Sequence, residues 1–342
     1  MSHYVVLRHH APEPGKVLLG LLFTFALSAN VFPQGGPRGA IAGTVRDTTG
    51  AAVPGASLEI INQATNAVER TVVTNMNGSF SAPLLPVGTY RVVVTLAGFS
   101  KAEAPDIRVL VSEITTVNLT MKVGPITETV TVTGVAAPVQ LSSPVTGETI
   151  QNVGDLPLAT RNFFSLLALS AGANTEMADT AALGRGSVSI NVNGQRPVNN
   201  NFQLEGINAN DFNLPILDNV PLPNPQTVQE FKTQTSLYDA SQGRNGGGNI
   251  QVALKSGSSH LHGDAFEFFR NNVLNANDFF LNRKGQHRPV LRQNQFGFSL
   301  GGPIPAGKDF FFFTNYQGTR AASGVSAGTT LGTNIPVLPT ER

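Results

Sequence analysis

Three histidines in the C-terminal third of the chain are of a residue type that could bind a metal ion. His260 and His262 are two residues apart, so in a strand they would share one face, and His287 follows later. Three imidazoles with an open fourth position form a common catalytic zinc site. The alternative is that they are ordinary strand histidines. We favour this alternative and predict no metal site.

Two other motifs have catalytic residue types but lack the context that catalysis requires. Residues 324–328 read G-V-S-A-G, the pattern of a hydrolase nucleophile, yet no histidine follows to act as the base. Residues 243–249 lack the Lys-Ser/Thr pair of a phosphate-binding loop, and their glycines are expected to let a loop pack close to backbone. With Cys 0, no cysteine nucleophile exists. We predict no enzyme, no catalytic residue and no cofactor.

The composition favours a β-rich protein of two or three domains. Of 342 residues, 41% are hydrophobic and 13% are charged, and Gly 35 with Pro 22 indicates many turns between short strands. Lys+Arg 23 against Asp+Glu 22 gives a formal charge of +1, without a basic run. Nucleic acid is therefore not an expected partner.

The first residues have the plan of a secretory signal. An uncharged apolar run over residues 17–29 follows the basic residues Arg8 and Lys16. The run is shorter than the about 20 residues that a membrane-spanning helix needs. An uncleaved anchor is the alternative. We predict export, with a signal peptide over residues 1–34.

The next segment alternates polar and apolar residues in short runs between turn signals. Val53-Pro54-Gly55 and Asn77-Gly78 have the residue types of tight turns. About seven strands at this spacing predict a β-sandwich. The predicted strands cover residues 41–45, 56–61, 70–74, 79–82, 88–96, 106–111 and 114–121.

This segment resembles a known accessory domain. The phrases GTVRDTTGAAVPGA, TNMNGSF and LPVGTYRVVV resemble the carboxypeptidase regulatory-like domain, a transthyretin-like sandwich with a carbohydrate-binding-like fold. The resemblance implies that fold without peptidase activity, because in that family the sandwich lacks the zinc site. Its aromatic side chains, Phe80, Tyr90 and Phe99, are expected in the core.

An alternating peptide after the sandwich has the pattern of a partner-binding strand. In PITETVTVTG, residues 125–134, the threonines face one way and Ile, Glu and Val the other. Such a peptide on a Pro- and Ser-containing tether can add itself to another protein's sheet edge. The alternative is a last strand of the sandwich. The predicted partner-binding residues, which look like the TonB box of TonB-dependent outer-membrane receptors, are Glu128, Thr129, Val130, Thr131 and Val132.

One helix and several strands are predicted after this peptide. The helix covers residues 161–170, with Thr160 as N-cap and Gly172 just past its end. Alternation over residues 187–193, closed by Asn193-Gly194, predicts a strand and a tight turn. Further strands are predicted over residues 201–207, 227–235 and 249–255.

These elements resemble the plug domain of TonB-dependent receptors. The phrases LPLATRNFFSLLALSAGA, INVNGQRPVNNNFQLEGI and VQEFKTQTSLYDASQGRNGGGNIQVALKSGSS carry the resemblance, which is to the Oar-like branch with an N-terminal carboxypeptidase regulatory-like module. The order of sandwich, box and plug makes it more specific than one motif. Glu205 stands before Gly206 where that family is expected to have Asp, a change that keeps the charge.

The last segment has the pattern of a barrel wall. Residues 295–300 alternate Gln, Gly and Ser with Phe, Phe and Leu, the apolar-out, polar-in dyad of an outer-membrane strand. Residues 310–313 with Tyr316 predict another strand, and HGDAFEFFRN and FGFSLGGPI resemble the first barrel strands of Oar-like receptors. A plugged transporter barrel has about 22 strands. We therefore expect only its beginning here, in a C-terminally truncated receptor; a split gene product and an incomplete gene model are the alternatives.

The predicted fold class is mainly β, in five segments. They are a signal peptide (1–34), a seven-stranded β-sandwich (35–124), the TonB box and linker (125–140), a mixed α+β plug (141–258) and the first strands of an incomplete outer-membrane β-barrel (259–342).

The resemblance implies a transporter that gates energised uptake of an unknown nutrient across the outer membrane. The implied partners are TonB with ExbB and ExbD, an unknown small-molecule or oligosaccharide ligand, and the outer membrane, with sandwich and plug on the periplasmic side. Ligand-binding residues are unknown, and residues 196–201 are only a guess. The alternative hypothesis is a carbohydrate- or partner-binding sandwich without transport activity.

Overall fold

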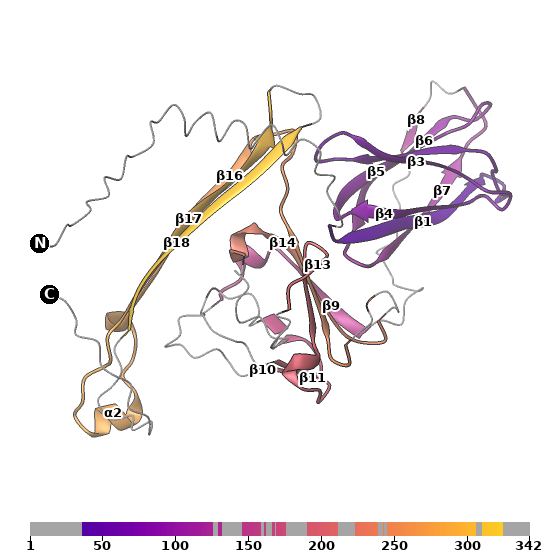
Figure 1. Ribbon diagram of the computed structural model, residues 1–342. Helices are drawn as coiled ribbons and strands as arrows, with labels where there is room; N and C mark the ends of the chain where they lie inside the picture. Colours follow the sequence, from indigo (N-terminus) through magenta and orange to yellow (C-terminus); the bar gives the residue numbers. More distant parts are fainter. Residues whose placement is uncertain are drawn as a thin grey trace, which may run out of the picture. The chain divides into compact units, whose positions relative to one another are not determined.

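The computed structural model describes a chain that is mainly β (Figure 1). The predicted signal peptide lies outside the described residues. No helix within the described ranges is long and apolar enough to cross a membrane. The described residues are 36–125, 129–131, 146–158, 161, 166–167, 169–175, 190–210, 223–238, 242, 245–305 and 310–323.

The N-terminal part consists of two β-sheets. Its strands are β1 (Arg38–Asp47), β2 (Ser57–Asn62), β3 (Val68–Val73), β4 (Ser79–Pro86), β5 (Gly88–Thr95), β6 (Lys101–Val109), β7 (Ile114–Met121) and β8 (Thr129–Thr131). One sheet has the order β4-β1-β7, and the other has the order β3-β2-β5-β6-β8. Each of the seven predicted strands is present, with ends that differ by a few residues. The predicted turns have left-handed backbone at Gly55 (φ 75°) and Gly78 (φ 70°).

Both N-terminal sheets contribute to one hydrophobic core. In β7 every second residue is buried, as expected for a strand with one face on a core. Tyr90 is fully buried, and its hydroxyl donates to the carbonyl oxygen of Pro86 at 2.8 Å. Phe80 is buried in the same core and Phe99 packs against it. The core positions predicted for these three aromatic residues are confirmed.

Strand β6 begins earlier than the alternation pattern predicts. Asp106, the predicted first residue, lies inside the strand with left-handed backbone (φ 57°). The pairing of β5 with β6 shifts between Tyr90 and Val92, which marks a bulge. A bulge changes the face on which residues lie, so the alternation before it is out of step with that after it.

A third sheet and a second hydrophobic core follow in the middle of the chain. The sheet has the order β13-β12-β15-β14-β9, and a separate pair joins β10 to β11. Phe231 and Ile250 are fully buried in its core. The elements are β9 (Thr146–Gln151), η2 (Val153–Asp155), β10 (Ala173–Thr175), β11 (Ile190–Val192), η5 (Pro197–Asn199), β12 (Asn201–Leu204), β13 (Ile207–Asn208), η6 (Pro225–Thr227), β14 (Val228–Ser236) and β15 (Asn249–Leu254).

The α-helix predicted over residues 161–170 is wrong at the described positions. Arg161 has left-handed backbone (φ 52°), and Leu166 and Leu167 lie in a 3₁₀ turn. Both leucines are buried in the middle core, so tertiary packing rather than a regular helix accounts for the apolar spacing. The predicted N-cap Thr160 and residues 162–165 and 168 lie outside the described residues.

The single strand predicted over residues 201–207 is a hairpin instead. Strand β12 ends at Leu204, because Glu205 (φ 53°) and Gly206 (φ 73°) form a left-handed two-residue turn. The chain then returns as β13. The predicted turn at Asn193-Gly194 is confirmed, with φ of 50° and 75°.

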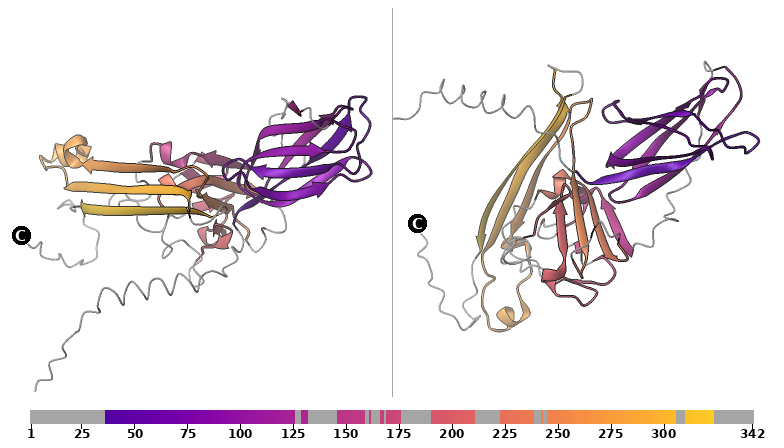
Figure 2. Two further views of the ribbon diagram at one scale, coloured as in Figure 1. Left: turned by 90° about the horizontal axis from the view of Figure 1, so that it is seen from above. Right: turned by 45° about the vertical axis from the view of Figure 1, so that its right-hand side comes forward.

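The C-terminal part is a three-stranded antiparallel sheet with the order β16-β17-β18 (Figure 2). Its elements are β16 (His262–Asn271), η8 (Asn272–Leu274), α2 (Phe279–Arg283), β17 (Leu291–Pro303) and β18 (Phe311–Ser323). The strand predicted over residues 262–271 is confirmed, the prediction over residues 295–300 lies within the longer β17, and the prediction over residues 310–313 with Tyr316 lies within β18 except for Phe310. Helix α2 was not predicted; it starts where the Asp278 carboxylate accepts from two backbone N–H groups.

Candidate functional site

Part of the predicted TonB box is an edge strand of the N-terminal domain's own sheet. Strand β8 pairs in parallel with β6, with Thr129 opposite Lys101, Val130 opposite Ala102 and Thr131 opposite Glu103. The structure therefore shows the alternative that the sequence left open, a last strand in the sheet. Glu128 and Val132 lie outside the described residues, and a partner-binding role for the five residues stays a prediction.

The chain just before β8 is attached to the beginning of β6. Ser100 N–H donates to Lys122 O at 2.8 Å, and Gly124 N–H donates to Gly98 O at 3.2 Å. A Cβ on Gly124 would lie 2.5 Å from the Ser100 hydroxyl oxygen, so a larger residue there would require that hydroxyl to rotate away. These bonds place the chain beside β6 five residues before Thr129.

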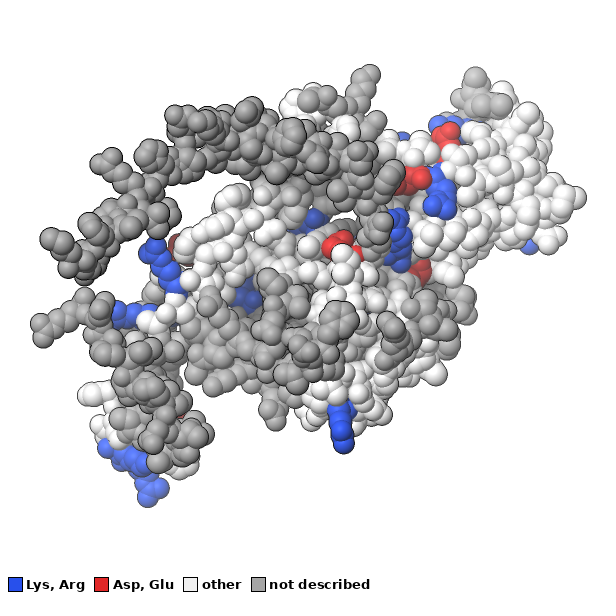
Figure 3. Space-filling model, in the orientation of Figure 1, with Lys and Arg blue, Asp and Glu red and all other residues white. Residues whose placement is uncertain are grey.

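The turn between β6 and β7 contacts the middle sheet through a buried charged cluster. Lys232 Nζ lies 2.7 Å from Glu113 Oε1 and donates to Val111 O at 2.6 Å. Glu230 Oε1 accepts from Val111 N–H at 2.8 Å. Glu230 and Lys232 are 1% and 4% exposed. On the face of the molecule that Figure 3 shows, by contrast, the described Lys and Arg side chains are scattered over the surface.

Burial controls the ionisation of Glu230. Burial raises its pKa to about 7, although the N–H of Val111 and the charge of Lys232 both favour the carboxylate. Among the described residues, Glu230 Oε2 has no hydrogen-bond partner. Burial also raises the pKa of Glu205, whose carboxylate accepts from the N–H of Leu254. Glu205 therefore holds the β12–β13 turn against β15.

Sequence reasoning missed this charged cluster. Glu230, Lys232 and Gln234 alternate with core residues along β14, which shows that they share one face. An alternating strand normally exposes such a face to water. Only the three-dimensional contact with Val111 and Glu113 shows that this face is buried.

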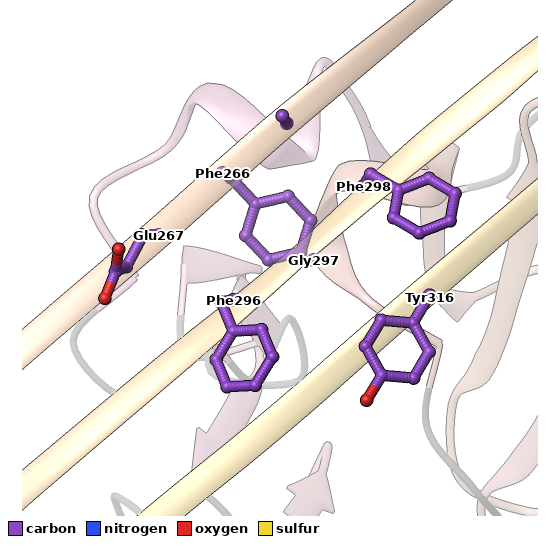
Figure 4. A pocket seen from close by; sticks show the side chains of 7 residues that line it. Phe266, Glu267, Phe296, Gly297, Phe298 and Tyr316 are labelled. Carbon is purple, nitrogen blue, oxygen red and sulfur yellow. The ribbon is translucent and has the colours of Figure 1, made fainter.

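The C-terminal sheet has the reverse of the polarity found in a water-soluble sheet. On β17, Gln295 and Ser299 are 7% and 5% exposed, whereas Phe298 and Leu300 are 46% and 37% exposed. Phe298 is paired with Tyr316, which is 53% exposed, and Figure 4 shows the two rings on neighbouring strands. The predicted alternation is confirmed: the polar row is covered and the aromatic row is open.

The open aromatic face also carries a charged side chain beside its rings. Glu267 is directly paired with Phe296, so both lie on this face, and Glu267 is exposed. The two residues line a shallow apolar hollow together with Phe298 and Tyr316 (Figure 4).

The covered face of this sheet contacts preceding residues. The Arg161 guanidinium lies over the ring of Phe268, 3.8 Å from its centroid, and burial lowers the pKa of Arg161. Lys255 Nζ lies 3.7 Å from Asp264 Oδ2. Phe268 and Asp264 are paired with Gln295 and Ser299, so they lie on the same face as the covered polar row.

The histidines do not assemble a metal site in the described part of the chain. His260 Nδ1 lies 3.1 Å from Ser259 Oγ, and His262 Nδ1 lies 3.1 Å from Ser258 Oγ. No group of three or more His, Cys, Asp or Glu side chains among the described residues, which include His287, could hold a metal ion. The G-x-S-x-G motif at residues 324–328 lies outside the described residues.

The residues guessed as ligand contacts, 196–201, include a structural side chain. Asn200 is 3% exposed; its Nδ2 donates to Ile190 O at 2.8 Å and its Oδ1 accepts from Gly248 N–H at 2.9 Å. A Cβ on Gly247 would lie 2.8 Å from the backbone carbonyl oxygen of Asn199, which confirms at Gly247 that this loop packs close to backbone. Gly243 and Arg244 lie outside the described residues.

Two family models match separate parts of the chain. Residues 40–122 match the carboxypeptidase regulatory-like domain, and residues 253–336 match an outer membrane beta barrel domain. The chain is 27% identical over 279 residues to the TonB-dependent transporter Oar of Myxococcus xanthus. The aligned region covers 75% of this chain and 25% of that protein. The chain thus spans about a quarter of the length of this curated relative.

Solved structures give only weak likenesses. A cohesin–X-dockerin complex from Acetivibrio cellulolyticus matches at 22% identity and a TM-score of 0.21, over 25% of this chain and 58% of that chain. Catechol 1,2-dioxygenase from Acinetobacter radioresistens matches at 14% identity and a TM-score of 0.22, over 27% of this chain and 53% of that chain. TM-scores this low carry no argument about function.

We predict that Glu230 makes the stability of the chain depend on pH. Because its folded-state pKa of about 7 exceeds the ordinary value of 4.5, the folded chain keeps a proton that the unfolded chain has lost. The free energy of unfolding therefore falls as pH rises from about 4.5 to about 7, by up to about 3 kcal/mol, and levels off above.

The measurement is urea unfolding across this pH range for the parent chain and for Glu230→Gln. The substitution should reduce the pH dependence, whereas Glu59→Gln, at an exposed position, should leave it unchanged. An equal slope in the parent chain and Glu230→Gln would contradict the assignment.

Proposed function

We propose that this chain supplies parts of a TonB-dependent outer-membrane transporter: a periplasmic β-sandwich, a TonB box, a plug and the first strands of the barrel wall. The observation that carries the proposal is the reversed polarity of the C-terminal sheet, which exposes Phe298, Leu300 and Tyr316 and covers Gln295 and Ser299. An aromatic face open to the surroundings is stable in lipid and unfavourable in water.

The order of parts along the chain supports the same proposal. The carboxypeptidase regulatory-like match comes first and the outer membrane beta barrel match comes last. Between them lie the predicted box and the middle sheet, which we assign to the plug. The similarity to a TonB-dependent transporter extends over 75% of the chain. The contact of Arg161 with Phe268 suits a plug that packs against the polar inner face of a barrel wall.

The proposed transport cycle needs no catalytic residue in this chain. TonB, working with ExbB and ExbD, would capture residues Glu128, Thr129, Val130, Thr131 and Val132 and move the plug. The energy would come from the inner-membrane proton gradient. The cargo is an unidentified small molecule or oligosaccharide, and the sandwich and plug would lie on the periplasmic side of the outer membrane.

The alternative function, a carbohydrate-binding sandwich without transport, has weaker support. A sugar site usually offers exposed aromatic rings. Phe80 and Tyr90 are 5% and 0% exposed, and Phe99 packs against the same core. These rings are used to hold the two sheets together.

The partner assignment predicts that a peptide of residues 125–134 binds the C-terminal domain of TonB. Val130→Pro removes a backbone N–H from the middle of the strand and should weaken binding about tenfold or more, since one strand hydrogen bond is lost. Gly134→Pro, at the peptide's end, is the control and should bind like the parent. Isothermal titration calorimetry measures this, and no binding by the parent peptide would reject the box.

The membrane assignment predicts different surroundings for two neighbouring residues of β18. Tyr316 lies on the open aromatic face and Gln317, which pairs with Gly297, on the opposite face; both are exposed. Because the chain has Trp 0, Tyr316→Trp and Gln317→Trp are single-tryptophan reporters. In vesicles with brominated acyl chains, quenching should be several-fold stronger for Tyr316→Trp. Equal quenching would mean that this face does not contact lipid.

A further inference from the structure

The outer edge of β6 is a strand-binding edge that this chain itself occupies. Lys101, Ala102 and Glu103 pair on that side with residues of β8, while β5 pairs with the other side of β6. The pairing residues of β8, Thr129 to Thr131, are the central three of the five predicted box residues. While β8 is docked, a partner that needs the side of β8 facing β6 cannot pair with it.

We propose that the N-terminal domain masks the TonB box by holding it as strand β8, so that docking on β6 and capture by TonB exclude each other. This inference rests on the proposed function and adds a regulatory step to it. The box would be free for a partner only in the fraction of molecules in which β8 has left β6. The masking device is thus the edge of β6, not a property of the box sequence.

The attachment of the preceding chain makes docking favourable. The bonds from Ser100 to Lys122 and from Gly124 to Gly98 fix the chain beside the start of β6. Val123 also forms an isolated antiparallel bridge with Phe99. Only residues 125–128 separate this anchor from Thr129, so the effective concentration of the box at the edge is high.

The shortness of β8 keeps the docking reversible. The ladder spans three residues, Thr129 to Thr131, and short ladders have few hydrogen bonds to break. If the undocked state is populated at about 1 to 10%, the apparent Kd of the full chain for TonB is raised about 10- to 100-fold above that of the free peptide. An equal Kd for the full chain and the peptide would overturn the proposal.

A reversible cross-link tests masking directly. Glu103 and Thr131 are register partners, and paired Cα atoms of neighbouring strands lie within disulfide reach. The chain has Cys 0, so Glu103→Cys with Thr131→Cys introduces one possible disulfide. In the detergent-solubilised full chain, oxidation with copper phenanthroline should form the disulfide and abolish TonB binding. Reduction with dithiothreitol should restore it.

A matched cross-link elsewhere in the same sheet is the control. Ser57→Cys with Val73→Cys joins paired residues of β2 and β3, away from β8, and its oxidation should leave TonB binding unchanged. Failure of the Glu103→Cys, Thr131→Cys double variant to cross-link, or equal TonB binding when it is oxidised and reduced, would overturn masking. Cross-linking without any TonB binding by the reduced chain or the free peptide would instead reject the proposed function.

Discussion

Hydrogen bonding at the edges of sheets determines how the N-terminal domain and the predicted box relate to each other. If β8 were absent, the backbone groups that residues 101–103 direct toward it would be unpaired at the outer edge of a four-stranded sheet, and such an edge attracts other strands. The predicted box, an extended β-branched peptide, also has backbone groups that need hydrogen-bond partners. The same covalent chain supplies both, because the bonds at Gly98 and Ser100 bring the box to the edge.

A second constraint is whether each face of a β-sheet is covered by protein or open to the surroundings. In the N-terminal domain the apolar rows of the strands point into a closed core that contains Tyr90 and Ile60. In the C-terminal sheet the apolar row, with Phe298 and Tyr316, is open, while Gln295 is covered. The same two-residue alternation therefore places apolar side chains in a closed core in one sheet and on an open face in the other. The middle sheet shows a third case, in which the polar row with Glu230 and Lys232 is covered by a turn of another domain.

Local patterns in the sequence predicted the elements whose cause is local. Turn chemistry at Gly55 and Gly78 and the alternation of β7 and β17 were sufficient for those elements. Features that depend on distant contacts were not accessible: the left-handed Asp106 creates a bulge, and Leu166 is buried without a regular helix. For the candidate site, the sequence indicated the five predicted box residues but left open what they pair with. Spacing alone does not reveal which sheet edge lies nearby.

The position of β9 has a mechanical consequence. It is the outermost strand of the middle sheet and pairs only with β14, starting with Thr146 opposite Ser236. Thr146 is the first described residue after Thr131, so tension applied to the box toward the middle sheet would reach β9 before β14 or β15. A strand held on one side can be peeled away one hydrogen bond after another, whereas β14 and β15 are each held on both sides. Under load, β9 is the segment of this sheet that yields first.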